Sequence, residues 1–498
     1  MRTSSRNDFL FLFSLILQFL EDEVKGKSYK VIVINLLKKG KDSQKENAMS
    51  KKAALHNLGC KVNAYELEAM QQLLEEGGYE IVPFEPGADV YVINTCTVTN
   101  IADRKSRQML HKAKKMNPDA IVVAAGCYVQ AAGEELKKDE SIDIVIGNNK
   151  KQNLLEILEE YQRKRATDFS NIIDINHTKE YEPLRITRTA EHTRAYLKIQ
   201  DGCNQFCTYC IIPFARGRVR SRSMADVMQE VEKLAQAGYQ EVVLTGIHLS
   251  SYGTDFESCE KSGDYPYGKE LLKLIAAIQK TEGITRIRLG SLEPGIVTEA
   301  FAAELSGCDK VCPHFHLSMQ SGCDATLKRM NRRYDTAQFA DRCRILRKYF
   351  NNPALTTDII VGFPGETEEE FAKTRAYVEQ INFFETHVFK YSRRKGTKAA
   401  VMENQVPEQK KAQRSQILIE LGQRHQKSYA EGFLGKEVEV LFEEKTVENG
   451  HSYWTGHTRE YVKAKKESER DLTNVQRACM VSGVGEDGTL YVSDKTRQ

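Results

Sequence analysis

The sequence predicts an α/β protein that ends in a small all-β part. From residue 53 to about 160, and again from about 194 to 392, short apolar segments alternate with amphipathic helical segments. This alternation is typical of parallel strands joined by helices. After residue 431 the helical spacing gives way to short strand-like runs separated by turns, which indicates an all-β module. At 498 residues the chain is too long for one core, so we expect several domains.

The first alternation predicts an open parallel sheet. Its candidate strands are 53–58, 89–94, 121–125 and 142–146, and its candidate helices are 66–76, 101–116 and 154–158. Residues 161–190 are polar and aperiodic, which favours a linker. We therefore expect a first domain at 49–160 and a linker at 161–190.

The second alternation is longer and predicts a barrel-like sheet. Its six candidate strands are 194–200, 241–246, 285–290, 314–318, 354–361 and 385–391. Six strand–helix units in a row favour a barrel, and an open doubly wound sheet is the alternative. With the charged helix expected around 407–430, this domain covers 191–427.

The C-terminal part, 428–498, has candidate strands at 438–442, 461–464, 478–484 and 490–492. Residues 431–498 contain ten Lys and Arg against thirteen Asp and Glu. This acidic balance gives no sign of nucleic-acid binding by itself.

The composition excludes several classes of protein. The 72 Lys and Arg nearly balance the 69 Asp and Glu, so the net charge of +3 points to no polyanionic partner. Hydrophobic residues make up 41 % of the chain, which excludes disordered and collagen-like proteins. Twelve cysteines in 498 residues are too few for a disulfide scaffold.

The N-terminal segment is expected to lie outside the folded protein. The apolar run Phe9–Leu20 is too short to span a membrane, and the acidic Glu21–Glu23 follows it where a signal cleavage site would stand. The segment Met49-Ser50-Lys51-Lys52 directly precedes the first expected strand, as at an ordinary protein start. We therefore expect residues 1–48 to be an over-long start or a dispensable extension, and we expect no membrane association.

Three cysteines stand close together after the first strand of the second alternation. Cys203, Cys207 and Cys210 form a C-x3-C-x2-C pattern, and three thiolates on one loop can hold three irons of a 4Fe-4S cluster. No fourth cysteine lies within twenty residues, so one iron would stay open for a substrate or cofactor. A zinc site completed by a distant ligand is the alternative.

Three further cysteines occupy equivalent positions in the first alternation. Cys60, Cys96 and Cys127 each follow the carboxyl end of an expected strand. In an open parallel sheet these ends form one crevice, so we expect the three thiols to converge on a second cluster. The alternative is that they are small buried side chains. The remaining cysteines lack ligand spacing and are expected to be ordinary thiols; they are Cys259, Cys308, Cys312, Cys323, Cys343 and Cys479.

With these residues in view, the chain resembles the radical S-adenosylmethionine (SAM) methylthiotransferase family. The string CNQFCTYC resembles the cluster motif of radical-SAM enzymes. The flanking strings resemble the branch that modifies threonylcarbamoyladenosine in tRNA; they are NLGCKVNAYE (57–66), NTCTVTNIADRKSRQ (94–108), DGCNQFCTYCIIPFARGRVRSR (201–222), TGIHLSSYG (245–253) and TGHTREYVK (455–463). The resemblance covers about 53–495.

The resemblance implies a transferase with a partial (βα)6 radical-SAM barrel and a C-terminal RNA-binding TRAM module. It implies two 4Fe-4S clusters, one on Cys203, Cys207 and Cys210 and an auxiliary one on the other three cysteines. It also implies two SAM molecules per turnover, one as radical source and one as methyl donor. The implied reaction is methylthiolation at C2 of N6-threonylcarbamoyladenosine at tRNA position 37, so the clusters rather than side-chain acids or bases carry the chemistry. The alternatives within the family are isopentenyladenosine of tRNA and an aspartate of a ribosomal protein.

The resemblance also implies partners and a location. The partners are a tRNA carrying threonylcarbamoyladenosine and a reductant protein of the flavodoxin or ferredoxin type, and the location is the cytoplasm. A hypothesis of another class is a non-catalytic iron–sulfur protein that binds RNA through its tail and its arginines.

Candidate SAM contacts are taken from positions that match the family. They are Tyr209 in the cluster loop, Gly246 after the second strand, Ser291 and Glu293 after the third, Gln320 after the fourth and Asp358 in the fifth. Gly246 has the alternative of a turn glycine, and Glu293, followed by a proline, that of a helix start.

Candidate RNA contacts are mainly arginines. Arg216, Arg218, Arg220 and Arg222 alternate, so an extended segment would place them on one face near the cluster loop. The alternative is a solvated segment with internal ion pairs. In the tail, Arg459, Tyr461 and Lys463 resemble the RNA-facing part of the TRAM module, whereas Trp454 is expected in its core.

Overall fold

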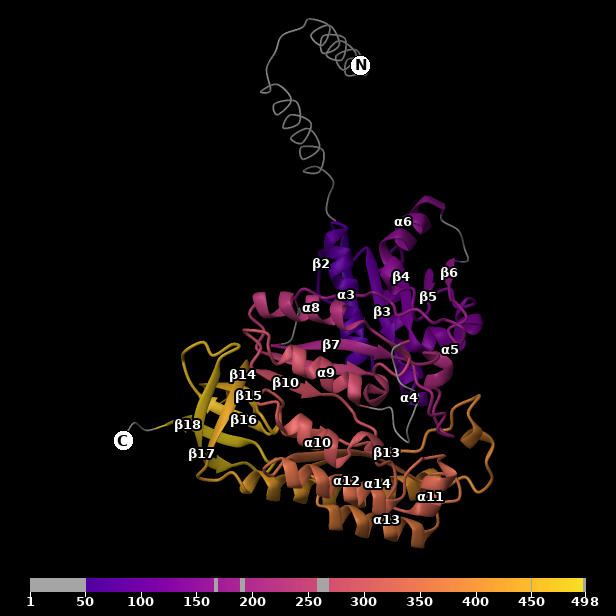
Figure 1. Cartoon of the computed structure of the whole chain (residues 1–498). Coiled ribbons are helices and arrows are strands. Elements are labelled where there is room, and N and C mark those ends of the chain that lie inside the picture. Colours follow the sequence, from indigo (N-terminus) through magenta and orange to yellow (C-terminus); the bar gives the residue numbers. More distant parts are fainter. Residues whose placement is uncertain (1–50, 165–168, 189–192, 258–267, 449, 496–498) are drawn as a thin grey trace, which may run out of the picture. The chain divides into compact units, whose positions relative to one another are not determined.

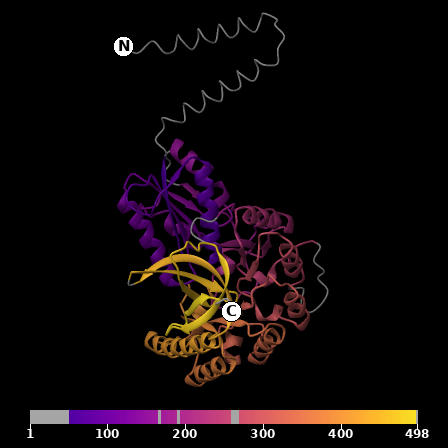
Figure 2. The same ribbon diagram turned by 90° about the vertical axis from the view of Figure 1, so that its left-hand side faces the viewer.

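The structure is a computed structural model that describes residues 51–164, 169–188, 193–257, 268–448 and 450–495. The predictions for residues 1–48 and for Cys259 lie outside the described residues. The description below concerns the unit that begins at Lys52, which forms one compact body. In Figures 1 and 2 it runs from indigo at its N-terminal sheet to yellow at its C-terminal strands.

The N-terminal part is an open parallel sheet, as predicted. Its strand order is β2-β1-β3-β4-β5-β6, and every neighbouring pair is parallel. The strands are β1 (Lys52–Asn57), β2 (Glu80–Ile81), β3 (Val90–Thr95), β4 (Ile121–Gly126), β5 (Ile144–Ile146) and β6 (Phe169–Asn171). The helices are α3 (Lys61–Glu76), α4 (Asn100–Met116), α5 (Cys127–Leu136), the 3-10 turn η1 (Lys151–Asn153) and α6 (Leu154–Lys164).

Helices cover both faces of this sheet, because its strands are apolar on both sides. Tyr91 and Ile93 pack against Leu110 of α4 on one face. Val90 and Val92 pack on the other face in the cluster that contains side chains of α3 and α6. Such two-sided burial is the usual environment of a parallel strand, and it explains the nearly continuous apolar run of β3.

The segment expected to be a linker contributes to the sheet instead. Strand β6 pairs with β5 in parallel register, with Ile144 opposite Phe169 and Ile146 opposite Asn171. A three-residue strand is too short to show a period in the sequence. Its backbone is recruited by the free edge of β5, a tertiary contact that local pattern does not predict.

The central part contains six parallel strands in chain order. They are β7 (Arg194–Asp201), β9 (Glu241–Gly246), β10 (Arg286–Leu289), β11 (His314–His316), β12 (Ala354–Val361) and β13 (Glu385–Lys390). Ladders join β10-β9-β7 and β11-β12-β13, and bridges from Ile287 to Val311 and from Leu292 to Leu317 connect the two groups. A strand order that follows the chain is that of a partial barrel, and the doubly wound alternative is wrong.

The longer helices of this part pack their apolar sides into the core on the outer side of the barrel, and the shorter helical segments lie in the connections between elements. They are α7 (Ile212–Ala215), α8 (Met224–Gln236), η2 (Leu249–Ser251), α9 (Lys269–Ile278), η3 (Pro294–Ile296), α10 (Glu299–Ser306), α11 (Asp324–Arg329), α12 (Thr336–Tyr349), α13 (Glu368–Ile381) and η4 (Lys398–Val401). A short strand, β8 (Arg220–Ser221), runs antiparallel to β7. Ala195, Leu197 and Ile199 of β7 belong to the large apolar core. Since strand residues alternate between faces, Arg194, Lys198 and Gln200 lie on the inner side.

The C-terminal part is a closed five-stranded barrel that follows the long helix α14 (Glu408–Glu431). Its strands are β14 (Glu437–Glu448), β15 (His451–Thr458), β16 (Lys463–Glu467), β17 (Gln476–Val484) and β18 (Leu490–Asp494). The all-β prediction is confirmed, and Trp454 lies in its core, 5 % exposed. Strand β15 escaped prediction because polar and small residues interrupt it.

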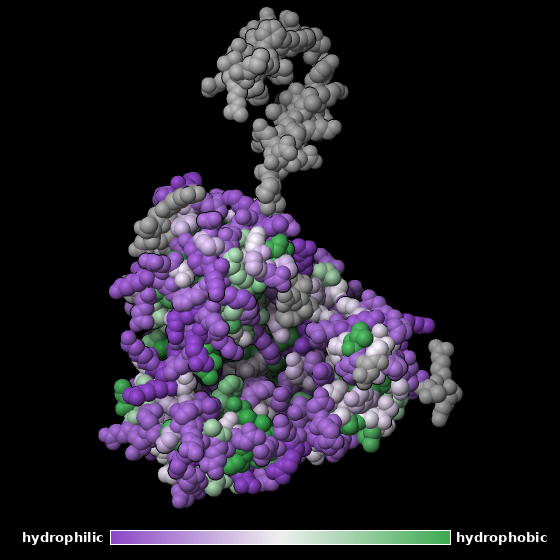
Figure 3. All heavy atoms as spheres, turned by 180° about the vertical axis from the view of Figure 1, so that it is seen from behind, coloured by the Kyte–Doolittle hydropathy of each residue, from purple (hydrophilic) through white to green (hydrophobic). Residues whose placement is uncertain are grey.

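In the described part of the chain no helix combines the length and apolar character that crossing a bilayer requires. The face of the molecule in Figure 3 is mainly hydrophilic, with separate hydrophobic groups beside a hollow near its middle.

Candidate active site between two cysteine groups

The three N-terminal cysteines stand at the carboxyl ends of adjacent strands. Cys60 is the N-cap residue of α3 after β1, Cys96 follows β3, and Cys127 begins α5 after β4. Because β1, β3 and β4 are neighbours in the sheet, their ends lie side by side. The loop after β1 touches Cys96, since a Cβ on Gly59 would lie 3.0 Å from the Cys96 sulfur. The structure thus brings the predicted auxiliary group together.

Two asparagines hold these strand ends in place. The side-chain nitrogen of Asn63 donates to the carbonyl oxygens of Leu58 at 2.7 Å and Thr95 at 3.0 Å. The side chain of Asn94 donates to the Asn63 carbonyl at 2.8 Å. Gly126, with φ +99°, packs beside them. A larger residue would not fit there, because its Cβ would lie 2.5 Å from the Asn94 side-chain oxygen. The group therefore depends on polar side chains as well as on the cysteines.

A buried arginine connects this cysteine group to the central barrel. The Nε of Arg216 donates to the sulfur of Cys127 at 3.0 Å, and its Nη2 donates to Asn63 at 2.7 Å. The third nitrogen pairs with Glu66 at 2.8 Å and with Asp201 at 3.1 Å. Arg216 is 0 % exposed, so all its donors are used inside the protein, and its positive charge faces a sulfur.

The Arg216 contacts belong to a larger buried charge network. Glu66 is also within 3.0 Å of Lys151 and 2.7 Å of Lys198, and Asp201 is 2.7 Å from Lys198. Burial alone would raise the pKa of Glu66, but Arg216 and the two lysines outweigh it and hold that pKa well below its usual range. Three cations, Arg216, Lys151 and Lys198, therefore meet two carboxylates beside this cysteine group.

The barrel cysteines lie on the loop between β7 and α7. The Cys203 amide donates to the Gly217 carbonyl, and the Cys210 amide donates to the Cys207 carbonyl, each at 3.0 Å. Gly202, with φ +71°, permits this close return because a Cβ there would lie 1.8 Å from the Arg218 carbonyl oxygen. These contacts fold the loop back on itself and keep its three cysteines within one short segment.

An arginine also contacts this second group. Arg332 donates from Nη1 to the Cys207 sulfur at 3.3 Å, and from Nη2 to Glu293 at 2.8 Å. Arg332 is thus the counterpart of Arg216. His248 stands nearby, with its Nε2 3.8 Å from the Glu293 carboxylate. Glu293, a predicted SAM contact, is therefore ion-paired beside the cysteine loop.

The predicted SAM contacts fall on two sides of the cysteine loop. On one side, Gly246 abuts Gln200, since a Cβ on it would lie 2.9 Å from the Gln200 side-chain oxygen, and Glu293 lies near His248. Ser291 is exposed. On the other side, Tyr209, Gln320 and Asp358 line one pocket of about 240 Å³. Backbone bonds between Gln320 and its neighbours Asp358 and Ile360 hold Gln320 at φ +67°.

This pocket is bounded by both cysteine-bearing segments. Cys210, Ile211 and Ile212 form part of its wall, and Val98 and Thr99, which follow Cys96, form another part. The rest comes from the ends of β12 and β13 and the residues after them; these are Ile360, Phe389, Lys390, Tyr391 and Ser392. A ligand in this pocket would lie between the two cysteine groups.

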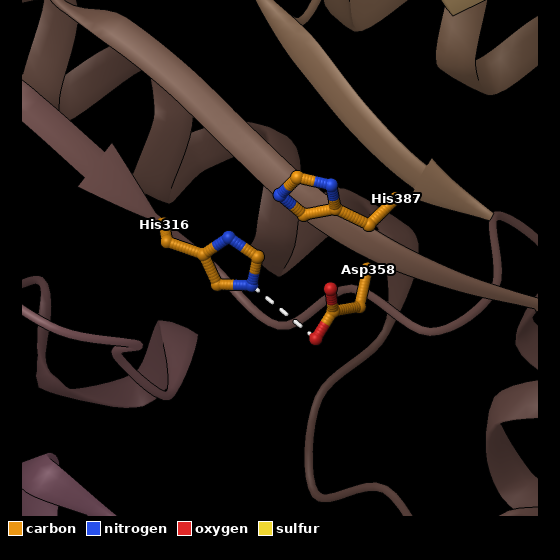
Figure 4. A group of neighbouring side chains, drawn as sticks. All are labelled: His316, Asp358 and His387. Atoms are coloured by element: carbon orange, nitrogen blue, oxygen red, sulfur yellow. Dashed lines mark ion pairs between the residues drawn. The ribbon is translucent and has the colours of Figure 1, made fainter. Parts of the chain in front are cut away.

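Two histidines accompany Asp358 on the inner side of the barrel. Figure 4 shows the side chains of His316, Asp358 and His387 projecting toward one another from three adjacent strands. His316 Nε2 is 3.4 Å from the Asp358 carboxylate, and the two imidazoles stack with centroids 5.7 Å apart. The ligand atoms lie within 4.8 Å of one another. Two imidazoles and a carboxylate are ligand types of a divalent transition metal, unlike the thiols that suit an iron–sulfur cluster.

The prediction that four alternating arginines face RNA is wrong for three of them. Arg216, Arg220 and Arg222 are at most 1 % exposed. Arg220 lies 3.6 Å from Asp201, and Arg222 pairs with Glu230 at 2.5 Å. Their acidic partners come from other segments of the chain, so the segment itself contains no sign of the pairing. Arg218 is exposed, with its guanidinium 4.4 Å from the centre of the Phe206 ring.

Two of the three tail residues expected to face RNA contact the central part instead. Arg459 donates to the backbone carbonyl oxygens of Asp309 and, at 3.0 Å, Val311 in the central part. Tyr461 has the guanidiniums of Arg194 and Arg288 within 5.0 Å and 4.8 Å of its ring centre. These two side chains fasten the tail barrel to the central barrel. Lys463 is exposed.

Several site residues were missed by sequence reasoning. Asn63, Arg332 and His248 contact the cysteine groups or their partners. Asn63 and His248 stand in the strings GCKVN and TGIH, where their nearness to a predicted site residue was a usable signal. Arg332 lies 125 residues from Cys207, and nothing local marks it.

The donor sets can be tested for fit to iron–sulfur clusters. Each group offers three thiols, and each has an arginine on one sulfur to offset negative charge. Burial raises the pKa of Cys96 and of Cys203 to about 12. These thiols therefore stay protonated at neutral pH until a metal displaces the proton. Both sets fit a cluster with three protein ligands.

Comparisons with known families agree with this geometry. Residues 52–147 match the "Uncharacterized protein family UPF0004", and residues 197–378 match the Radical SAM superfamily. A threonylcarbamoyladenosine tRNA methylthiotransferase of Bacillus subtilis (strain 168) is 43 % identical over 84 % of this chain and 91 % of its own length. One of Aquifex aeolicus (strain VF5) is 38 % identical over 86 % of this chain and 99 % of its own.

A relative of a different stated activity is also similar. A tRNA-2-methylthio-N(6)-dimethylallyladenosine synthase of Acetivibrio thermocellus is 36 % identical over 88 % of this chain and 87 % of its own. Among solved structures, a radical S-adenosylmethionine methyltransferase, TsrM, from Kitasatospora setae has a TM-score of 0.53 at 16 % identity. The match covers 71 % of this chain and 74 % of that one, and it supports the fold alone.

Proposed function

Because this chain belongs to the radical-SAM methylthiotransferase family, we propose that it is a tRNA methylthiotransferase acting on N6-threonylcarbamoyladenosine. The reaction replaces the hydrogen on C2 of the adenine, beside the anticodon, with a methylthio group. The two relatives described above that are named for threonylcarbamoyladenosine are 43 % and 38 % identical, against 36 % for the dimethylallyladenosine synthase of Acetivibrio thermocellus. This difference favours the first substrate.

The pocket between the two cysteine groups carries this proposal. It is lined by Cys210 of one cysteine loop and by Val98 and Thr99, just after Cys96 of the other. A reaction that needs both a radical source and a sulfur donor requires one substrate atom to reach two metal centres. A single pocket with a wall from each segment meets that requirement.

The side chains around the pocket hold and orient the reacting groups. When bound, the two 4Fe-4S clusters and SAM supply one-electron cleavage of SAM, the transferred sulfur and the methyl group. Arg216 and Arg332 would stabilise the thiolate ligands, because a guanidinium beside a sulfur favours its negative charge. Tyr209, Gln320 and Asp358 would contact SAM or the base from the pocket wall.

The proposal assigns parts of the chain to separate tasks. Residues 49–160 would hold the auxiliary cluster, and residues 191–427 would hold the second cluster and SAM. Residues 428–498, the expected TRAM module, would contact RNA through exposed residues such as Lys463. A flavodoxin- or ferredoxin-type protein would supply electrons, and the enzyme would work in the cytoplasm with its tRNA.

The decisive experiment uses reconstituted enzyme, SAM, a strong reductant and tRNA that carries threonylcarbamoyladenosine. Mass spectrometry of the nucleosides is expected to show the 2-methylthio derivative. A parallel reaction with tRNA that carries dimethylallyladenosine serves as the competitor substrate. Product only in the second reaction would overturn the substrate assignment, and the absence of SAM cleavage in both would overturn the reaction itself.

A further inference from the structure

Helix α4 carries an exposed cationic face that the reactions above do not use. Arg104, Lys105, Lys112 and Lys115, here called the α4 basic face, are exposed, and none forms an ion pair with any described residue. The opposite side of the helix is buried through Ser106, Leu110 and Ala113. At 100° per residue the four cations lie on one side of the helix, away from the sheet.

The other charged groups of α4 are already engaged. Asp103, the only acidic residue of the helix, pairs with Arg394 at 2.7 Å. Arg107 donates to the Tyr128 hydroxyl at 2.8 Å, and Lys114 pairs with Asp143 at 2.9 Å. The cations of this helix that no described carboxylate neutralises are therefore the four of the α4 basic face and Arg107, whose partner is an uncharged hydroxyl. The α4 basic face is available for a polyanion.

The N-terminal end of α4 lies at the pocket. The helix is capped by Thr99, which lines the pocket together with Val98. The Asn100 amide donates to the Ser392 hydroxyl at 3.0 Å, so this end is tied to another pocket residue. From there the helix extends about 25 Å at 1.5 Å per residue. A partner bound along α4 can thus place one end at the pocket mouth.

Exposed apolar side chains lie in, or within two residues of, the segments that line this pocket. Val98, Ile101, Phe214 and Phe389, here called the apolar rim, are 51 %, 53 %, 46 % and 47 % exposed. Val98 and Phe389 line the pocket, and Phe214 is two residues from the pocket residue Ile212. Exposed aromatic rings are the usual platform for unpaired bases, whereas a protein partner of high negative charge gains little from them.

We propose that the α4 basic face binds the phosphates of the anticodon stem while the apolar rim contacts unpaired loop bases next to the modified adenosine. This inference rests on the proposed function and names where its substrate docks. A rigid basic helix that starts at the pocket suits a double-stranded stem, and an apolar rim suits a single-stranded loop. It also explains how RNA is held although three of the four expected arginines are buried.

The test is binding of tRNA to the full-length enzyme at several salt concentrations. We expect Arg104→Gln, Lys105→Gln, Lys112→Gln and Lys115→Gln together to weaken binding at least about tenfold and to lower the slope of log Kd against log salt by about 3. The matched control removes four exposed cations from outer helices and their ends; they are Lys233, Lys280, Lys373 and Arg424, each changed to Gln. Equal losses in both variants, or none in the α4 variant, would overturn the proposal.

Two further measurements separate the alternatives. An α4 variant that binds tRNA normally, and loses activity with a flavodoxin but not with dithionite, would make α4 a docking site for the acidic reductant and would overturn the proposal. Phe389→Ala is expected to weaken binding of the stem-loop without changing the salt slope. Reductant-driven SAM cleavage without tRNA, unchanged in the α4 variant, confirms that its fold and clusters are intact. If wild-type enzyme binds tRNA in this way but forms no methylthio product, the proposed reaction fails while the docking surface stands.

Discussion

Arg216 donates a hydrogen bond from Nε to the sulfur of Cys127 across 3.0 Å, although 89 residues separate the two in the chain. The arginine follows the cysteine loop of the central barrel, and the cysteine belongs to the N-terminal sheet. The auxiliary cysteine group is therefore completed by a side chain from the other cysteine-bearing part. The cluster expected on the N-terminal part then depends on the correct packing of both parts.

Replacing Arg216 should damage the auxiliary group selectively. Arg216→Met leaves Glu66 and Asp201 buried with fewer cations, so we expect a loss of about 3–5 kcal/mol in the free energy of unfolding. Iron per chain after anaerobic reconstitution should fall from about eight toward about four. Arg222→Met is the matched control, because Arg222 is equally buried but pairs with Glu230 and touches no cysteine. Equal iron loss in the two variants would contradict a specific role at Cys127.

Substitutions in the two cysteine groups should affect SAM cleavage differently. Cys207→Ser is expected to abolish reductant-driven SAM cleavage, because it removes a ligand of the cluster that binds SAM. Cys127→Ser should retain SAM cleavage but form no methylthio product. The partly exposed Cys308 provides a control, since Cys308→Ser removes a thiol far from both groups in the sequence and should change neither reaction. Loss of SAM cleavage in Cys127→Ser would show that the two sites do not act independently.

Acid should destabilise the central barrel by protonating Glu241. Burial alone would raise the pKa of Glu241, but Arg288, Arg194 and Arg286 outweigh it and lower that pKa from 4.5 to about 2. A carboxyl with a lowered folded-state pKa stabilises the protein above pH 4.5, and this stabilisation is lost as the pH falls toward 2. We expect a contribution of about 3 kcal/mol.

Urea unfolding of wild-type protein and Glu241→Gln at a series of pH values measures this contribution. The difference in the free energy of unfolding should be largest near neutral pH and should shrink as the pH falls from about 4.5 to about 2. A difference that stays constant over this window would mean that Glu241 does not change its protonation there.

Removing the Tyr461 ring should loosen the tail barrel. The ring centre lies 5.0 Å from the guanidinium of Arg194 and 4.8 Å from that of Arg288, and the ring stacks on His457 with centroids 4.5 Å apart. Tyr461→Ala is expected to cost about 1–3 kcal/mol and to increase hydrogen exchange in β14 and β15. Lys463→Ala, two residues away and exposed, is the control and should leave exchange unchanged. Because Tyr461 faces the barrel, its loss should not change the salt dependence of tRNA binding.

What could be predicted from the sequence is what neighbouring residues determine. The strand spacing and the position of Cys60, Cys96 and Cys127 after strands predicted that the three lie together, since a parallel sheet aligns those ends. The position of Arg216 was predicted wrongly because its partners are distant in the sequence. Arg216 pairs with Glu66, which lies 150 residues earlier, and no local pattern reports such a partner. The basic face of α4 was not singled out from the sequence, because the common direction of its side chains is clear only when the burial of Leu110 on the opposite side is known.

The buried position of Glu66 bears on the order in which the protein assembles during synthesis. The ribosome completes the N-terminal sheet before it reaches Lys198 and Arg216, two of the three cations that neutralise this carboxylate. Until these two cations emerge, Glu66 must stay hydrated or protonated, because burying an unpaired carboxylate is costly. The surface of the first sheet that carries Glu66 therefore cannot yet be buried. The first sheet, expressed alone, should thus be soluble only in a loosened form. Loading of the auxiliary site would then wait for the barrel to be made.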